Sequence, residues 1–410
     1  MAFDSGDVAW VLTATLLVLM MLLPGLALFY GGLVRAKNLL SVMSQVMGVG
    51  AVAILAWVGW AYSLAFSGSG LIVGDFAKAG LAGMDGDTAW ALATPGKAIP
   101  ELLFACFQMS FAAITIALVV GALVERVRFS AMLLFSALFV TIVYAPIAHM
   151  VWAADGLIFQ TGAIDFAGGT VVHVNAGIAG LVGVAFAGPR IGFLKEAMPP
   201  HSLALVLVGA GLLWVGWFGF NAGSALEANG VAAIAMLNTF VAPAAGLLAW
   251  MGIERWRSGK PSLLGGASGA VAGLVAVTPA AGISGPLGAM LLGAIGSAAC
   301  YSFIALAKHR LKLDDSLDVF GIHGLGGIVG SIGTALVALP ALGGHGGADY
   351  AFGAQLARQI GAVLLAIGWS AAGSAICFGL TKLAVPLRLG ADEEREGLDV
   401  AEHGERAYNP

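Results

Sequence analysis

"DVFGIHGLGGIVGSIG", residues 318–333, places a single histidine among small and apolar residues. A second stretch, "VVHVNAGIAGLVG" (residues 171–183), has a very similar layout. When His173 is aligned with His323, glycines follow both histidines at the fourth, seventh and tenth positions. This shared spacing indicates an internal repeat with one histidine in each half, although a chain rich in glycine can produce such a match by chance.

The composition is that of a membrane protein. Of 410 residues, 59% are hydrophobic and only 10% are charged, too few to cover the surface of a soluble protein of this length. The 60 glycines fit the same interpretation, because small residues let helices in a membrane approach closely. A net charge of -4 gives no basic surface for nucleic acid.

Apolar stretches near the length that crosses a bilayer recur along the whole chain. They are long and do not alternate between polar and apolar residues, so they predict an all-α polytopic fold and favour helices over a β-barrel. The eleven predicted helices are 8–33, 39–65, 99–122, 129–152, 168–188, 202–226, 231–253, 263–280, 286–307, 319–339 and 355–381. The outer loop 66–98 is expected to hold short helices.

Lysine and arginine residues predict the orientation. With the N-terminus outside, 16 of the 19 basic residues fall on the inner side, and only Lys78, Lys97 and Arg358 remain outside. The sequence therefore predicts a multi-pass protein of the cytoplasmic (plasma) membrane with its N-terminus outside and its C-terminus in the cytoplasm.

The two histidines fall on predicted helices five and ten, which cross the membrane in opposite directions. This arrangement predicts an inverted repeat of five plus five helices, 8–188 and 202–339, with helix eleven outside the symmetry. Transporters with such repeats place their working site where the halves meet, near the bilayer midplane. Residues 1–381 form the predicted membrane domain, and the polar residues 382–410 form a cytoplasmic tail, for which an acidic, solvated end is the simplest interpretation.

A single histidine in a membrane helix is usually a packed ring bonded to a backbone carbonyl. Two at equivalent positions favour function, because titratable groups are costly there. Facing neutral rings can satisfy each other and still offer atoms to a solute. A zinc site is the sharper alternative, but no suitable third ligand is visible. Each histidine also follows an aspartate, Asp165 or Asp318, at unequal intervals.

Other chemistry is mostly missing from the sequence. The glycines form no nucleotide-binding fingerprint, and Gly96-Lys97 and Gly259-Lys260 lack the Ser or Thr of a Walker motif. The three cysteines, Cys106, Cys300 and Cys377, lie in apolar runs and predict buried free thiols. We therefore expect no cofactor, no metal and no enzyme activity.

Several long motifs identify a family. "DFAGGTVVHVNAGIAGLVG", "FQMSFAAITIALVVGALVERVRF", "WFGFNAGSA" and "DVFGIHGLGGIVGSIG" closely resemble the ammonium transporter (Amt/Mep/Rh) family, in its bacterial and archaeal Amt branch. The resemblance runs from "ALFYGGLVRAKN" to the tail. It implies a homotrimer with one pore through each subunit.

The resemblance also implies roles for individual residues. Phe107, Trp152 and Ser224 match an outer vestibule that recruits ammonium. Phe111 and Phe220 match a pair of stacked phenylalanines that closes the pore, above the twin histidines His173 and His323. Asp165 matches an aspartate with a structural and electrostatic role.

The implied function is transport: ammonium is recruited, deprotonated and conducted as ammonia through a hydrophobic pore. The tail segment "GLDVAEHGERAY" is similar to a family motif that contacts neighbouring subunits, and a PII-type nitrogen-signalling protein is an expected partner at the inner mouth. Two alternatives stay open, an electroneutral Rh-like gas channel and an ammonium sensor. A fused sensor is not favoured, because no kinase or cyclase sequence follows the tail.

Overall fold

The computed structural model describes residues 3–347 and 349–408, which are mostly helical. Within them, eleven helices are long and apolar enough to cross a membrane, as the sequence predicted. These spans are Ser5–Leu33, Ala36–Phe66, Glu101–Leu123, Phe129–Thr161, Gly169–Ala187, Leu203–Gly223, Gly230–Ser258, Leu263–Ala280, Pro286–Leu311, Phe320–Val337 and Phe352–Ala384.

Kinks and turns divide some spans into several helices. In chain order, the helices that build the spans are α1 (Ser5–Met20), α2 (Ala27–Leu33), α3 (Leu39–Ala56), α4 (Tyr62–Phe66), α5 (Glu101–Leu123), α6 (Phe129–Phe139), α7 (Ala145–Trp152), α8 (Leu157–Thr161), α9 (Asn175–Ala187), α10 (Leu203–Gly223), α11 (Gly230–Ser258), α12 (Leu263–Val277), α13 (Pro286–Leu306), α14 (Leu325–Val337) and α15 (Phe352–Ala384).

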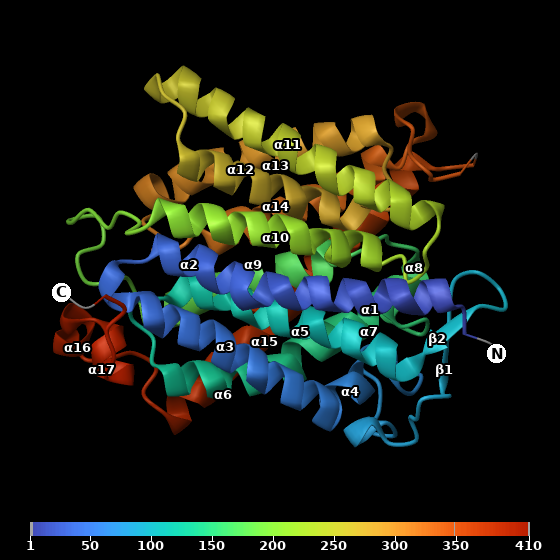
Figure 1. Ribbon diagram of the computed structural model, residues 1–410, viewed down its shortest axis with the longest axis horizontal. Helices are drawn as coiled ribbons and strands as arrows, with labels where there is room; N and C mark the ends of the chain where they lie inside the picture. Colours follow the sequence, from blue (N-terminus) through green and yellow to red (C-terminus); the bar gives the residue numbers. More distant parts are fainter. Residues whose placement is uncertain (1–2, 348, 409–410) are drawn as a thin grey trace.

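The long helices run roughly along one axis of the molecule (Figure 1). The marked N and C ends lie at opposite ends of this axis, as an odd number of crossings requires (Figure 1). Near the N-terminal end, β1 (Ala89–Ala91) pairs antiparallel with β2 (Ala98–Pro100). The two short tail helices, α16 (Ala391–Glu396) and α17 (Leu398–His403), lie at the other end.

Most predicted helix ends agree with the structure to within a few residues. The fourth span is longer than predicted, because α8 follows α7 after a short turn. Helix α15 continues to Ala384, past the predicted end at residue 381. The outer loop contains the β1–β2 hairpin and one short 3-10 turn at Ala79–Leu81, rather than several short helices.

The repeat is visible where the fifth and tenth spans cross. In each span a π-helical turn carries the histidine, Gly169–Val174 or Phe320–Gly324, and α9 or α14 follows it. The glycine four positions after each histidine meets the residue just after the other histidine. A Cβ on Gly177 would overlap with the Cα of Gly324, and a Cβ on Gly327 would lie 2.9 Å from the backbone nitrogen of Val174.

The next glycines of the pattern also pack in equivalent ways. Gly180 faces Ala122 on the third span, and Gly330 faces Ala276 on the eighth. The third and eighth spans correspond to each other under the predicted five-plus-five symmetry. The glycine pattern is therefore a packing pattern, which lets the two halves approach backbone to backbone.

Two expectations from the sequence were wrong, one about a cysteine and one about the tail. Cys300 and Cys377 are buried, but Cys106 is exposed because it lies on the outward face of α5. The tail does not extend into solvent. Leu398 is fully buried, and its backbone N–H donates to the side chain of Asn38 at 2.9 Å.

Candidate functional site

At the N-terminal end of the bundle, which we call the outer end after the predicted orientation, a cavity of about 170 Å³ is lined mainly by aromatic rings. Phe107 on α5, Trp152 at the end of α7 and Ser224 just after α10 all line it, so the structure brings the three predicted recruitment residues together. The Trp152 indole donates to the backbone oxygen of Asp165 at 3.0 Å. The Ser224 hydroxyl donates to the backbone oxygen of Phe220 at 2.8 Å, which leaves its oxygen free to accept a hydrogen bond.

Two phenylalanine rings form a floor between this cavity and the next one: Phe111 lines the outer cavity, and Phe220 lines the one below. Phe111 and Phe220 stack with ring centroids 4.2 Å apart and an angle of 20° between their planes. Phe111 also lies edge-on to Phe107 and Trp152, at 5.0 and 5.8 Å. Both floor rings are buried, so the pair closes the outer cavity with apolar surface.

Below the floor, a small apolar cavity of about 10 Å³ contains the two histidines. The Nδ1 atoms of His173 and His323 lie 3.2 Å apart, and their ring centroids lie 5.2 Å apart. The His173 ring also lies 5.9 Å from the ring of Phe220. The predicted histidine pair therefore faces the underside of the phenylalanine pair.

The two rings meet although each lies near the start of its helix. Helices five and ten begin at Gly169 and Phe320, one residue after each predicted start. His173 and His323 are thus about one helical turn from the ends of their own helices. Because both helices begin deep in the bundle, their first turns lie side by side.

Aspartates cap both of these deep helix ends. The carboxylate of Asp165 accepts backbone N–H groups of Gly168, Gly169, Thr170 and Val171 at 2.7–3.0 Å. Asp315 accepts those of Val319, Phe320 and Gly321 at 2.8–3.4 Å. Each aspartate stands eight residues before its histidine. The sequence comparison of Asp165 with Asp318 was therefore wrong, and the equivalent residue is Asp315.

Asp318 stands five residues before His323. The equivalent position in the outer half, five residues before His173, is Gly168. Both residues have a positive φ, +59° at Asp318 and +108° at Gly168. The turn before each histidine therefore has a similar backbone conformation in both halves, but only the inner one carries a charge.

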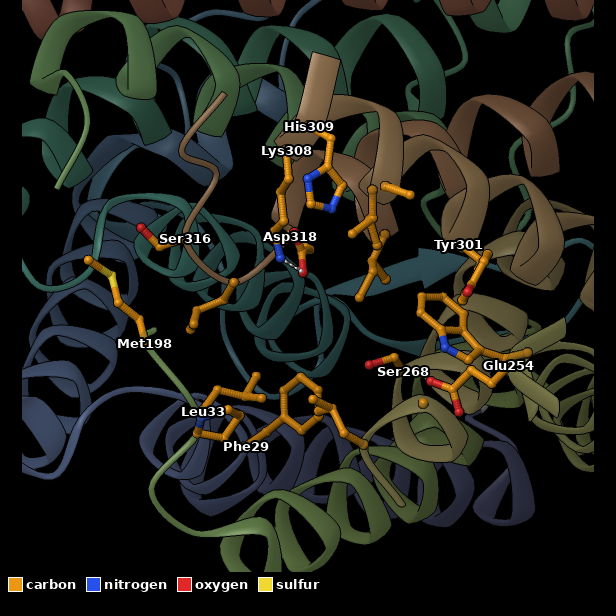
Figure 2. Close-up of a pocket in the computed structure, with 18 residues that line it drawn as sticks. Phe29, Leu33, Met198, Glu254, Ser268, Tyr301, Lys308, His309, Ser316 and Asp318 are labelled. Atoms are coloured by element: carbon orange, nitrogen blue, oxygen red, sulfur yellow. Dashed lines mark hydrogen bonds and ion pairs between the residues drawn. The ribbon is translucent and has the colours of Figure 1, made fainter. Parts of the chain in front are cut away.

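On the C-terminal side, a third cavity of about 340 Å³ opens between α2, α11, α12 and α13 (Figure 2). Phe29 lines both this inner cavity and the small histidine cavity. The three cavities therefore follow one another along the bundle. Phe111 and Phe220 separate the outer from the middle cavity, and Phe29 lies between the middle and inner ones.

A buried ion network holds the loops around this inner end. Glu125 bonds with Arg35 at 3.0 Å and with Arg190 at 2.9 Å, and Arg190 also bonds with Asp314 at 2.7 Å. Burial raises the pKa of Glu125, but the two arginines outweigh this effect and bring the pKa to about 2. Glu394 of the tail joins the network by accepting the backbone N–H of Ile191 at 2.7 Å.

No group of three or more His, Cys, Asp or Glu side chains that could hold a metal ion occurs in the described part of the chain. The predicted alternative of a zinc site therefore finds no further ligands there. The two histidines bond to each other instead.

Sequence reasoning missed several residues that line the cavities. Trp90, Phe104 and Gln108 line the outer cavity, and Trp217 lies beside His173 with ring centroids 5.5 Å apart. Trp217 precedes Phe220 by one helical turn, so helical spacing could have found it. Trp90 comes from the β1 strand, and its place depends on a long loop that carries no such periodicity.

Comparisons with known proteins agree on one family. The sequence profile of the Ammonium Transporter Family matches residues 9–408. An ammonium transporter of Aquifex aeolicus is 46% identical over 99% of this chain and 94% of its own length. One of Bacillus subtilis is 43% identical over 98% of both chains.

Solved structures are also similar. The crystal structure of Saccharomyces cerevisiae Mep2 matches with a TM-score of 0.85 and 36% identity, over 95% of this chain and 88% of that one. The structure of a protein named "Sensor Amt Protein" matches with a TM-score of 0.88 and 27% identity, over 97% and 98% of the two chains.

Proposed function

The chain belongs to the ammonium transporter family, and from this premise we propose that it conducts ammonium across the membrane as ammonia. Members of this family are transporters, not enzymes. The observation that carries the proposal is the contact between His173 and His323, beneath the stacked pair of Phe111 and Phe220. The steps follow the outer cavity, the phenylalanine pair beneath it and the middle cavity in turn.

Recruitment takes place in the outer cavity. Rings of Phe107 and Trp152 attract a cation through their π faces, an effect worth about 2 kcal/mol when the cation is desolvated. Ammonium can also donate a hydrogen bond to the Ser224 oxygen, whose own proton is already used on a backbone carbonyl. Potassium shares the first interaction but has no proton for the second.

Selection takes place at the phenylalanine pair. The cavity below it is apolar and just large enough for about one water molecule. A bare cation in the middle of a membrane costs about 3 to more than 10 kcal/mol. Ammonium avoids this cost by giving its proton to water in the outer cavity or to the histidine pair and passing as neutral ammonia, whereas potassium has no proton to give.

The histidines guide ammonia through the middle cavity. Their contact joins two Nδ1 atoms, so in the neutral pair one ring donates the proton and the other accepts it. The donating ring then has a bare Nε2, and the accepting ring has an Nε2–H. The pair therefore offers ammonia one acceptor and one donor, and it provides a route along which a proton can pass between the rings.

We propose that the N-terminus lies outside and the C-terminus in the cytoplasm of a plasma membrane, because this orientation puts most basic residues inside. In this orientation, the aromatic cavity is the entrance. We also propose a homotrimer. Exposed apolar side chains on neighbouring helices α1 and α10, among them Leu16 and Val215, leave a surface for lipid or for another subunit.

We assign residues 382–410 to a regulatory tail that follows the membrane domain 1–381, and a PII-type signalling protein is its proposed partner. The tail packs on the inner loops through Glu394 and Leu398. A pull-down with a cognate PII protein, with and without the tail, tests this partnership. Equal capture by both forms would contradict a role for the tail.

The test of transport is an ammonium pulse applied to purified protein in liposomes. A current above that of empty liposomes, absent with potassium, supports transport with net charge. Internal alkalinisation without current would support the electroneutral Rh-like gas channel instead. Ammonium binding with neither signal would support a sensor, the role that the name of one structural relative states.

A further inference from the structure

The inner cavity contains an ion pair that none of the proposed transport steps uses. The ammonium group of Lys308, after α13, lies 2.8 Å from the carboxylate of Asp318. Both side chains line the cavity and point toward each other, across from Phe29 and Leu33 (Figure 2). Lys308 and Asp318 are 36% and 24% exposed, so water and small ions can reach the pair.

Asp318 differs from the other carboxylates of this region in its partners. Asp315 is occupied by backbone N–H groups, Asp314 by Arg190, and Glu254 by Ser262. In the described chain, the Asp318 carboxylate has one hydrogen-bond partner, Lys308. If Lys308 moved away, a carboxylate would face the cavity directly.

This carboxylate stands at the exit of the proposed route. Asp318 is five residues before His323, and Ile322 next to that histidine lines the same cavity. Ammonia that passes the histidines enters this space and regains a proton there. A free carboxylate would then hold the resulting ammonium by a charge-assisted hydrogen bond.

We propose that Lys308 is a tethered competitor that prevents Asp318 from retaining ammonium at the inner mouth. The inference rests on the proposed transport function and deepens it. The lysine head group is itself an ammonium with three N–H donors, so it makes the same bond that the released solute would make. Because it is tethered, its effective concentration near Asp318 is about millimolar or higher, and free ammonium displaces it only at comparable concentrations.

The experiment uses right-side-out membrane vesicles that contain the full-length protein and are preloaded with ammonium at increasing concentrations. The measured quantity is the initial uptake of labelled methylammonium. Replacing the lysine, Lys308→Met, leaves Asp318 free. Internal ammonium should then halve uptake at a concentration roughly fivefold lower than in the unchanged protein, in line with the loss of a millimolar tethered competitor.

Three further variants separate competition from a structural role. The double variant Lys308→Met with Asp318→Asn should return to the unchanged sensitivity, and Lys308→Arg should keep it. Arg310→Met is the matched control, because Arg310 is an exposed cation two residues away that does not line the cavity. Thermal melting of each purified variant shows whether it is folded.

The proposal is overturned if folded Lys308→Met shows unchanged sensitivity to internal ammonium. It is also overturned if the double variant stays as sensitive as Lys308→Met. Failure of the underlying transport proposal looks different, because the unchanged protein would then take up no more methylammonium than vesicles without it.

Discussion

The outer and inner ends of the proposed pore share a backbone design and differ in their side chains. On each side, an aspartate caps a helix that begins deep in the bundle, and a histidine follows eight residues later. Between them stands Gly168 on the outer side and Asp318 on the inner side. The outer cavity is lined by aromatic rings, whereas the inner one contains the Lys308–Asp318 ion pair.

The shared backbone and the differing side chains have separate roles. The shared backbone brings the two histidines to one place, because equivalent glycines let the fifth and tenth spans cross closely. In the proposed transport route, the different side chains give each mouth its own chemistry, attraction of a cation at the outer end and a neutralised carboxylate at the inner end. The repeat thus accounts for the centre of the proposed pore, and the departures from it account for the ends.

The largest expected effect comes from breaking the crossing itself. In Gly177→Ala, the new methyl group would overlap with the backbone of Gly324, which cannot move aside like a side chain. We expect a cost of about 3 kcal/mol or more and a clear loss of folded protein, measured by thermal melting in detergent. Gly361→Ala is the control, because among the described residues no atom from outside its own helical turn lies within 4 Å of the added Cβ, and equal melting temperatures would contradict the packing argument.

The next largest effect concerns the contact between His173 and His323. His173→Ala and His323→Ala each remove the side-chain partner that the other ring has at Nδ1. Lost hydrogen bonding in a dry cavity costs about 1–3 kcal/mol, so we expect transport to fall roughly tenfold or selectivity over potassium to be lost. Uptake and selectivity measured on folded protein check this, and an unaltered His173→Ala variant would refute the role.

A smaller effect distinguishes the outer mouth from the inner one. Trp152→Leu removes one of the two rings proposed to attract the cation in the outer cavity, and with it about 1 kcal/mol of cation–π attraction. The external ammonium concentration for half-maximal uptake should rise roughly fivefold, as a loss of about 1 kcal/mol implies. Trp256→Leu serves as the control, because that indole is 83% exposed at the end of α11. A similar change in both variants would argue against a specific vestibule.

The last prediction is a pH dependence confined to the inner end. The pKa of Glu125 is about 2, below its usual 4.5, so its ionised form stabilises the folded protein. This contribution is fully present above about pH 4.5 and is lost as the pH falls toward 2. Hydrogen exchange should show the inner loops opening before the outer hairpin, and Glu125→Gln should reduce the acid dependence. Simultaneous opening of both ends would contradict this order.

Much of the fold could be predicted from residues close together in the sequence. Spans such as Leu263–Ala280 agree with the predicted bounds, because a helix must satisfy its own backbone and bury about 20 apolar residues in lipid. The repeat was also visible, since Gly177 and Gly327 keep the same distance from their histidines. The exposed face of Cys106 was not predictable, because an all-apolar helix does not show which face meets its neighbours.

The sequence by itself determined that eleven helices cross a membrane and that two histidines occupy equivalent places, because hydrophobic length and glycine spacing are local properties. Only the tertiary structure decided that the rings touch, that Asp315 rather than Asp318 matches Asp165, and that Lys308 reaches Asp318. These contacts depend on how deep each helix begins and on which turn precedes it. The physical reason is that hydropathy measures how apolar a segment is, whereas a contact requires the relative position of two segments.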